Sequence, residues 1–231
     1  MKNLGSRLEK IISYVNRCSI MADVGCDHGK VGTELLLRGV AGFCYFSDIS
    51  EACLNKARAH ALSKSVYSRC DFINCNGFVT YPTARKIDYA VVSGMGGIEI
   101  SSIVLNRPKD IKISKFVLQP NNNVVYLRRT LVENGFKIEK DEVVQENNMF
   151  YNILLVSEGI DTLSNDELEF GRTNLIKLDP AFKKYLEFKL GKLLAILESV
   201  KGTDKEAEVV DLIERIKSIV KKGEIKRCNK K

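Results

Sequence analysis

Short apolar runs alternate with helical patterns over most of the chain, and this alternation limits the possible folds more than any other feature. The apolar runs have the length of strands and occupy residues 20–24, 43–46, 66–73, 88–92, 115–118, 137–144 and 151–156. The helical patterns fall at residues 4–17, 30–39, 51–62, 97–106 and 123–134. Because apolar strands joined by crossover helices must be covered on both faces, the pattern predicts a mostly parallel sheet between two helical layers.

The last two strands of the predicted sheet are joined differently from the others. Only residues 145–149 separate them, which is too short for a crossover helix, so we expect an antiparallel hairpin at one edge. A parallel sheet that ends in such a hairpin is similar to the seven-stranded methyltransferase variant of the Rossmann-like architecture. The expected fold class is therefore α/β, with a Rossmann-like seven-stranded methyltransferase domain.

After Gly159 the pattern becomes helical throughout. Apolar residues recur every three or four positions in residues 182–200 and again in residues 209–220, close to the 3.5-residue period of a coiled coil. A break at residues 201–204 would let the two helices fold back on each other as an α-helical hairpin. We therefore predict a Rossmann-like domain over residues 1–159 and a helical coiled-coil domain with a basic tail over residues 160–231.

Positive charge is concentrated at the C-terminus. The chain has a formal net charge of +7, and its last eleven residues, 221–231, hold six Lys or Arg residues and one Glu. A basic tail on a nearly neutral body suits contact with a phosphate backbone, and Lys221, Lys222, Lys226 and Arg227 are the candidate residues. The alternative is a solvated helix end that binds nothing.

Several classes of protein are not expected. The seven cysteines form no C-x-x-C pair and are accompanied by only two histidines, so neither a metal site nor a disulfide framework is predicted. The chain has no run of 18 apolar residues and no secretory signal at its start, which predicts a cytoplasmic protein without a membrane span. We expect a monomer, while the helical pattern also leaves open pairing with a second copy.

The segment after the first predicted strand, Asp23-Val24-Gly25-Cys26-Asp27-His28-Gly29, carries the sharpest chemical signal. Its glycines let the backbone approach a ligand closely, and the helix that follows offers free N–H groups. A dinucleotide fingerprint would have a glycine where Asp27 stands, and a carboxylate there would repel a pyrophosphate. The carboxylate suits a ligand that carries an ammonium and a sulfonium, namely S-adenosylmethionine. A turn without any ligand is the alternative.

Three further strand ends carry polar or glycine-rich turns. Asp48 ends the second strand, where its carboxylate could accept the ribose hydroxyl hydrogens of a nucleoside or cap the next helix. Asn76 and Gly77 follow the third strand and could meet an adenine edge or simply form a turn. The fourth strand ends in Ser93-Gly94-Met95-Gly96-Gly97, whose glycines permit close approach to a bound group or make a tight turn.

The fifth strand ends in Leu118-Gln119-Pro120-Asn121. Amide side chains at this point could read the hydrogen-bonding edge of a base, and the rigid proline would fix their direction. A polar loop and helix cap would have the same residues.

These motifs, in this order, resemble the bacterial tRNA adenine-N1 methyltransferases that modify adenine 22. The resemblance begins at Arg7-Leu8, passes through the motifs that follow the first, fourth and fifth strands, and extends to the helical hairpin. It implies a Rossmann-like catalytic domain, S-adenosyl-L-methionine as cofactor, tRNA as partner, and a C-terminal coiled-coil domain that helps to hold the tRNA.

Specific roles follow from this resemblance together with the chemistry above. Asp27 and His28 are the candidate catalytic residues, with Asp27 stabilising positive charge on adenine; capping a helix or binding the donor's amino group are alternative roles for Asp27. The candidate cofactor-binding residues are Arg7, Asp23, Gly25, Cys26, Gly29, Asp48, Ile49, Asn76, Gly77, Ser93, Met95 and Gly96. The candidate substrate-binding residues are Gln119, Pro120, Asn121, Arg128, Arg129, Lys221, Lys222, Lys226 and Arg227. Methylation of another RNA or a small molecule, and RNA binding without catalysis, remain alternative functions.

Overall fold

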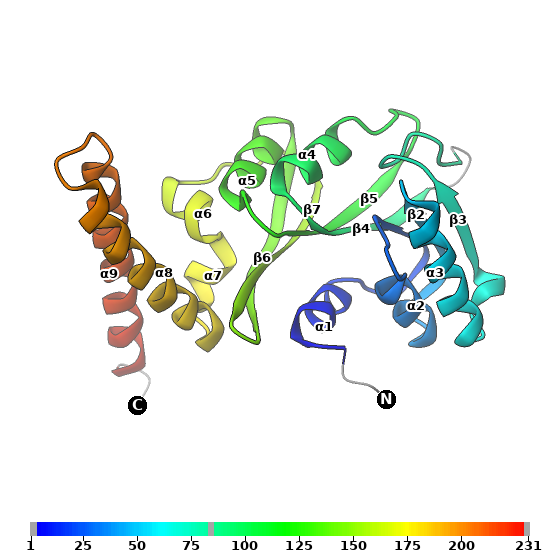
Figure 1. Ribbon diagram of the computed structural model, residues 1–231, viewed down its shortest axis with the longest axis horizontal. Helices are drawn as coiled ribbons and strands as arrows, with labels where there is room; N and C mark the ends of the chain where they lie inside the picture. Colours follow the sequence, from blue (N-terminus) through cyan, green and yellow to red (C-terminus); the bar gives the residue numbers. More distant parts are fainter. Residues whose placement is uncertain (1–3, 83–85, 229–231) are drawn as a thin grey trace.

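Seven strands form a single sheet in the order β3-β2-β1-β4-β5-β7-β6 (Figure 1). The computed structural model describes residues 4–82 and 86–228, with side chains described as far as residue 222. The strands are β1 (Cys18–Val24), β2 (Ala41–Asp48), β3 (Cys70–Asn74), β4 (Ile87–Met95), β5 (Ile113–Pro120), β6 (Phe136–Glu146) and β7 (Met149–Glu158). The first five are parallel, and β7 runs antiparallel to both β5 and β6. The predicted parallel sheet with an antiparallel hairpin at its edge is confirmed.

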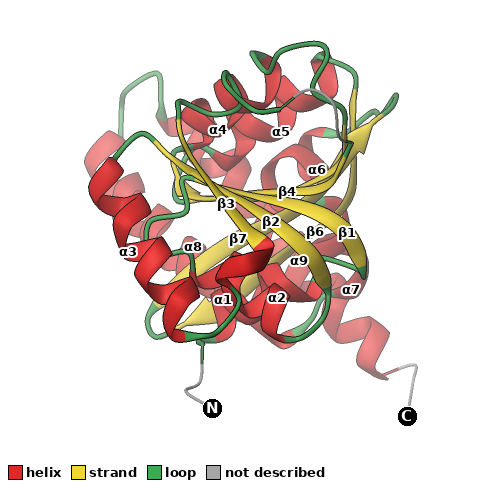
Figure 2. Ribbon diagram, turned by 90° about the vertical axis from the view of Figure 1, so that its right-hand side faces the viewer, coloured by secondary structure: helices red, strands yellow, loops and turns green. Residues whose placement is uncertain are grey.

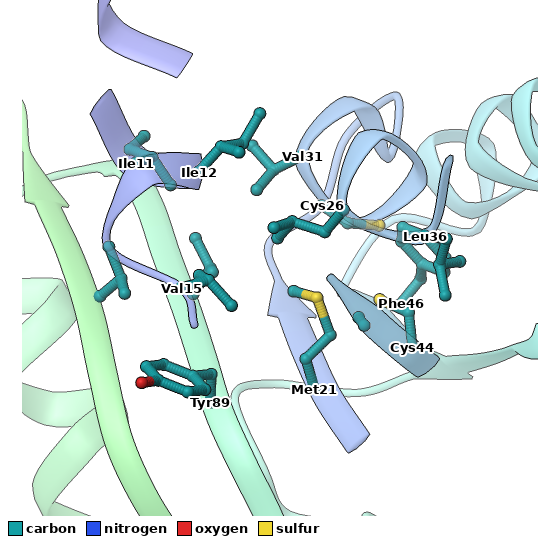
Figure 3. Close-up of a cluster of buried hydrophobic side chains, with 14 of the residues drawn as sticks. Ile11, Ile12, Val15, Met21, Cys26, Val31, Leu36, Cys44, Phe46 and Tyr89 are labelled. Atoms are coloured by element: carbon teal, nitrogen blue, oxygen red, sulfur yellow. The ribbon is translucent and has the colours of Figure 1, made fainter. Parts of the chain in front are cut away.

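Helices cover both faces of the sheet (Figure 2). Three pack on one face: α1 (Ser6–Ser13), α2 (Lys30–Leu37) and α3 (Glu51–Ser63). Two pack on the other face: α4 (Gly97–Leu105) and α5 (Val124–Glu133). Figure 3 shows the core under the first layer, a cluster that includes Ile11 and Ile12 of α1, Val31 of α2, and Met21 and Phe46 of the sheet. Helix α1 itself lies against β5, β7 and β6 and beside α2.

Two predicted elements have different limits in the structure. The predicted strand 66–73 begins only at Cys70, because residues 67–69 form a short 3₁₀ helix. Val66 is apolar because it packs into the core at the end of α3, where its N–H donates to the carbonyl of Ala61. The predicted helix 4–17 covers only residues 6–13, since Gly5 has a positive φ of 84° and Tyr14 ends the helix.

The chain after β7 is helical, as predicted, but it contains two short helices that the periodicity did not reveal. The helices are α6 (Asn165–Phe170), α7 (Arg172–Lys177), α8 (Pro180–Val200) and α9 (Glu206–Cys228). The last two lie side by side as the expected hairpin (Figure 1). Helix α6 begins with a capping box, in which Ser164 and Glu167 exchange side-chain and backbone hydrogen bonds.

Side chains of the helical segment also bind strand β6, which lies at the edge of the sheet. Three N–H groups of β6 donate to it: Ile138 to Asp161 Oδ2 (3.1 Å), Asp141 to Thr173 Oγ1 (3.0 Å) and Val143 to Asn174 Oδ1 (2.9 Å). A separate apolar cluster joins α6, α8 and α9 to Val143 of the same strand. The helical segment is therefore attached to the sheet by both polar and apolar contacts.

Candidate active site

A cavity of about 550 Å³ opens at the carboxyl ends of the central parallel strands. Ten predicted cofactor-binding residues line it: Arg7, Asp23, Gly25, Cys26, Asp48, Ile49, Asn76, Gly77, Ser93 and Met95. The predicted catalytic residues Asp27 and His28 also line it, as does Asn121. Gly29 and Gly96 are not lining residues, and instead each occupies the position before the first turn of a helix, α2 and α4 respectively.

The loop after β1 turns sharply toward the cavity. Gly25, Asp27 and Gly29 all have positive φ values, of 66°, 47° and 61°. A Cβ at position 25 would meet the Met95 Cε, the end of a flexible side chain that can move away. The positive φ is therefore the main reason for glycine at position 25.

Asp48 ties this loop to the end of β2. Its Oδ2 accepts a hydrogen bond from the Asp27 N–H at 3.1 Å, and its Oδ1 accepts one from the Ser50 N–H at 2.9 Å. Ser50, rather than Asp48, is the N-cap of α3, since its hydroxyl accepts from the N–H of Cys53. The alternative role of Asp48 as the helix cap is therefore wrong, and its carboxylate lines the cavity.

Asp27 and His28 lie at the open side of the cavity. Their side chains are 63% and 48% exposed, and Asp27 Oδ2 lies 3.7 Å from His28 Nε2. This separation is longer than a hydrogen bond, so the two side chains are not hydrogen-bonded to each other. Among the described residues no basic group pairs closely with the exposed Asp27 carboxylate, which can therefore interact with a substrate.

Asp23 is the buried acid of the site. Its Oδ2 accepts from the Gly32 N–H at 3.0 Å. Burial, together with the nearby Asp48 charge, raises the pKa of the Asp23 carboxyl to a net value of about 7. The hydrogen bond from Gly32 acts in the opposite direction and lowers the pKa. The protonated carboxyl is thus favoured in the folded protein over a wider pH range than in the unfolded chain.

This raised pKa predicts a pH dependence of stability. Between about pH 4 and 7 the folded state holds the Asp23 proton more tightly than the unfolded chain, so the contribution of Asp23 to folding falls as pH rises, by about 2–4 kcal/mol in total. Urea denaturation of the wild type and of Asp23→Asn at pH 4.5, 5.5, 6.5 and 7.5 measures it. The difference between the two unfolding free energies should change steadily across this range, and a constant difference would contradict the assignment.

The end of β5 differs from the prediction. Gln119 and Pro120 are buried, so neither can contact a base. The expectation that they bind substrate is therefore wrong. The Gln119 Oε1 accepts from Arg7 Nη1 at 2.8 Å, and its Nε2 donates to Asn121 Oδ1 at 3.1 Å. Asn121 is exposed and is the member of this motif that reaches the cavity.

Arg128 also differs from the prediction. Its side chain is fully buried and pairs with Asp141, with Nε–Oδ2 and Nη2–Oδ1 distances of 2.5 and 3.1 Å. Its guanidinium also donates to Asn152 Oδ1 and to the carbonyls of Leu168 and Glu169. Since every part of it is enclosed, the expectation that Arg128 contacts tRNA is wrong.

The other predicted substrate cations are placed as follows. Arg129, Lys221 and Lys222 are exposed. The side chains of Lys226 and Arg227 lie outside the described part of the structure, as does the end of the basic tail at residues 229–231.

Several cavity residues were not predicted. The lining residues outside the prediction are Leu8, Val24, Lys30, Val31, Cys75, Gly94, Glu99 and Ile103. Lys30 and Glu99 each stand in the first turn of a helix that follows a glycine-rich loop. Their places directly after the predicted glycine-rich loops indicate that both residues reach the cavity, because the first turn of such a helix faces the carboxyl edge of the sheet.

Two other features are absent from the described part of the chain. Among residues 4–82 and 86–228 no group of three or more His, Cys, Asp or Glu side chains is arranged to hold a metal ion. Within the same residues, no helix combines the length and the apolar character needed to cross a membrane.

The cavity suits a nucleoside cofactor in size and chemistry. Asp48 offers carboxylate oxygens at the end of β2, and Arg7 offers a guanidinium whose Nε is buried without a partner among the described residues. A seven-stranded sheet with this strand order and this cavity defines a Rossmann-like, S-adenosyl-L-methionine-dependent methyltransferase.

Comparison with known proteins identifies the family. The family described as tRNA (adenine(22)-N(1))-methyltransferase matches residues 21–222. The Bacillus subtilis enzyme of that name is 22% identical over 235 residues, covering 95% of this chain and 98% of that enzyme. A Mycoplasma pneumoniae relative is 34% identical over 138 residues, which span 59% of this chain and 62% of that relative's length.

A solved structure gives the same result. A Streptococcus pneumoniae protein in complex with S-adenosyl-L-methionine superposes with a TM-score of 0.84 at 27% identity, covering 94% of this chain and 99% of that one. The chain belongs to the tRNA (adenine(22)-N(1))-methyltransferase family. The expected fold class, cofactor and methyltransferase activity on tRNA are confirmed.

Proposed function

We propose that Asp27 is the carboxylate that assists methyl transfer to N1 of adenine 22, with His28 holding the loop that carries it. The observation that supports this assignment is the position of Asp27. Its exposed carboxylate lines the cavity, and its backbone N–H donates to Asp48 Oδ2. The alternative role as a cap of α2 has no support, because the cap position belongs to Gly29.

The chemistry of the acceptor explains why a carboxylate suffices. N1 of adenine has an in-plane lone pair and no proton, so no base is needed to activate it, and the main task is to align N1 with the methyl group. The cofactor supplies that methyl group on a sulfonium. The purine becomes cationic after transfer, and Asp27 can stabilise this charge or accept a proton from the exocyclic amine. The adenine must leave the folded tRNA to reach the cavity.

The cavity residues divide into groups that would hold the cofactor. Asp48 is placed to accept from ribose hydroxyls, and Asn76 and Gly77 follow β3 where an adenine edge would lie. Arg7 is placed to bind the donor's carboxylate, because its guanidinium forms no ion pair with any carboxylate among the described residues. The glycine-rich end of β4, from Ser93 to Gly96, would let the backbone approach the reacting methyl group.

A methyl-transfer assay tests the proposed function directly. Unmodified tRNA transcripts are incubated with the protein and S-adenosyl-L-methionine, and the modified nucleoside is identified after digestion. A transcript with guanine at position 22 is the matched control. Formation of 1-methyladenosine only in the wild-type transcript is expected. Methylation of the control transcript, of another atom, or of neither would reject the assignment and favour another acceptor or a binding role.

We further propose that the basic tail binds the tRNA backbone. Truncation before Lys221 removes six Lys or Arg residues and one Glu, and it should weaken tRNA binding. The dependence of log Kd on log salt concentration should flatten by about 0.7–0.9 for each phosphate that the tail no longer neutralises. Binding of S-adenosylhomocysteine should not change. Filter binding between 50 and 300 mM salt measures this, and an unchanged salt slope would show that the tail is only a solvated helix end.

We also propose that the protein is a monomer in the cytoplasm, which agrees with a tRNA substrate and with free thiols at Cys18, Cys26, Cys44, Cys53, Cys70 and Cys75. The proposed division into domains 1–159 and 160–231 is supported by the end of β7 at Glu158 and by the separate apolar cluster of the C-terminal helices.

A further inference from the structure

A continuous chain of hydrogen bonds runs behind the cavity from α1 to the end of β4. Arg7 Nη1 donates to Gln119 Oε1 at 2.8 Å, Gln119 Nε2 donates to Asn121 Oδ1 at 3.1 Å, and Asn121 Nδ2 donates to the Gly94 carbonyl at 2.6 Å. The middle member, Gln119, is fully buried, while Arg7, Gly94 and Asn121 all line the cavity. One buried amide therefore connects two separate walls of the site.

The direction of every bond in this chain is set by Arg7. A guanidinium can only donate, so the Gln119 oxygen must face Arg7 and its nitrogen must face Asn121. The Asn121 oxygen must then face Gln119, which leaves its nitrogen facing the Gly94 carbonyl. Neither amide can flip without placing two donors or two acceptors against each other.

Arg7 is held from two other sides. Its backbone N–H donates to Glu146 Oε2 at 2.9 Å, and its guanidinium lies 5.2 Å from the centre of the Tyr151 ring. Gln119 thus supplies the hydrogen bond that holds the guanidinium itself, at Nη1.

We propose that Gln119 is a positioning residue for methyl transfer, which orients Arg7 on the donor side and Asn121 with the Gly94 carbonyl on the acceptor side. This inference rests on the proposed function in one respect, the contact of Arg7 with the donor's carboxylate. Gln119 itself touches neither substrate, because it is buried. Its effect on the reaction is exerted through the two residues that it orients.

Two substitutions of Gln119 test its hydrogen bonds to Arg7 and to Asn121. Gln119→Glu still accepts from Arg7 but cannot donate to Asn121, and no orientation of the Asn121 amide then satisfies both the new carboxylate and the Gly94 carbonyl. Gln119→Leu removes both bonds. In both variants we expect kcat on tRNA to be about tenfold lower. The Kd of S-adenosylhomocysteine should rise about tenfold in Gln119→Leu, because Arg7 loses its fixed direction, and it should also rise in Gln119→Glu, because the new carboxylate pairs with Arg7 and competes with the donor's carboxylate.

The matched control is Asn174→Leu, which removes another buried amide, far along the chain and outside the cavity. Asn174 accepts from the Val143 N–H and donates to the Phe170 carbonyl, so its loss should lower stability without changing the ratio between cofactor affinity and kcat. Calorimetry with S-adenosylhomocysteine, steady-state kinetics on tRNA and thermal unfolding are measured for all variants.

The outcomes distinguish this proposal from the proposed function. Wild-type kcat in Gln119→Glu, or the same pattern in Gln119→Leu as in Asn174→Leu, would overturn the positioning role. Unchanged S-adenosylhomocysteine binding in Arg7→Met would instead reject the donor-side assignment of Arg7, and the kcat of Gln119→Glu would still decide the acceptor side.

Discussion

Replacing Asp27 by Asn is expected to lower kcat for methyl transfer to tRNA about 10²–10³-fold, because the carboxylate that stabilises the cationic adenine is removed. The fold should survive, since the side chain is 63% exposed and forms no close hydrogen bond with any residue that the structure describes. Asn is the best isosteric replacement here because it tolerates the positive φ of 47° at this position. Asp27→Ala should abolish transfer, and it adds about 1 kcal/mol of backbone cost at this positive φ.

Binding measurements give this prediction its control. The Kd of S-adenosylhomocysteine and the melting temperature should stay close to those of wild type in Asp27→Asn. Asp110→Asn, which neutralises another exposed carboxylate before β5, at the opposite end of the sheet, controls for the change in net charge. A wild-type rate for Asp27→Asn would remove Asp27 from the reaction, and a loss of cofactor binding would instead place it in the donor site.

Arg128→Met is expected to lower the free energy of unfolding by about 3–5 kcal/mol, because it leaves the buried Asp141 carboxylate without its partner. It also removes the donors to the Leu168 and Glu169 carbonyls, which connect α5 to the helical segment. This loss is a large part of the roughly 5–15 kcal/mol that is typical of a folded protein. Urea denaturation followed by circular dichroism measures it.

The neighbouring residue supplies the matched comparison. Arg129 lies next to Arg128 on α5 but is exposed, so Arg129→Met should change stability by less than about 0.5 kcal/mol. If Arg128→Met cannot be purified, the double variant Arg128→Met/Asp141→Leu should recover much of the stability, because it removes both buried charges. Equal stability of the two single variants would show that the buried pair contributes nothing.

The contrast between these two arginines illustrates what the sequence predicted and what it did not. Apolar runs, glycines at strand ends and the short connection before the last strand predicted the sheet and most of the cavity, because those features are local. The local sequence does not distinguish Arg128 from Arg129. The burial of Arg128 depends on Asp141 and on the carbonyls of Leu168 and Glu169, which come later in the chain.

The prediction that Gln119 contacts substrate is wrong for the same physical reason. Its place at the end of β5 indicated the right region, but its side chain is committed to Arg7, which lies 112 residues earlier in the chain. The predicted strand start at Val66 is wrong for a different reason. An apolar residue that packs into the core after the end of a helix has the same hydropathy as one that begins a strand. Helices α6 and α7 are too short, at six residues each, to show a helical period.

The hydrogen bonds from strand β6 to the helical segment have a consequence for solubility. An outermost strand normally exposes its N–H groups, which a strand from a second molecule can extend into a larger sheet. Here the donors of Ile138, Asp141 and Val143 are already occupied by Asp161, Thr173 and Asn174. Intermolecular strand addition is thereby blocked at these positions, so the residues that attach the helical segment also protect the protein against aggregation through this strand.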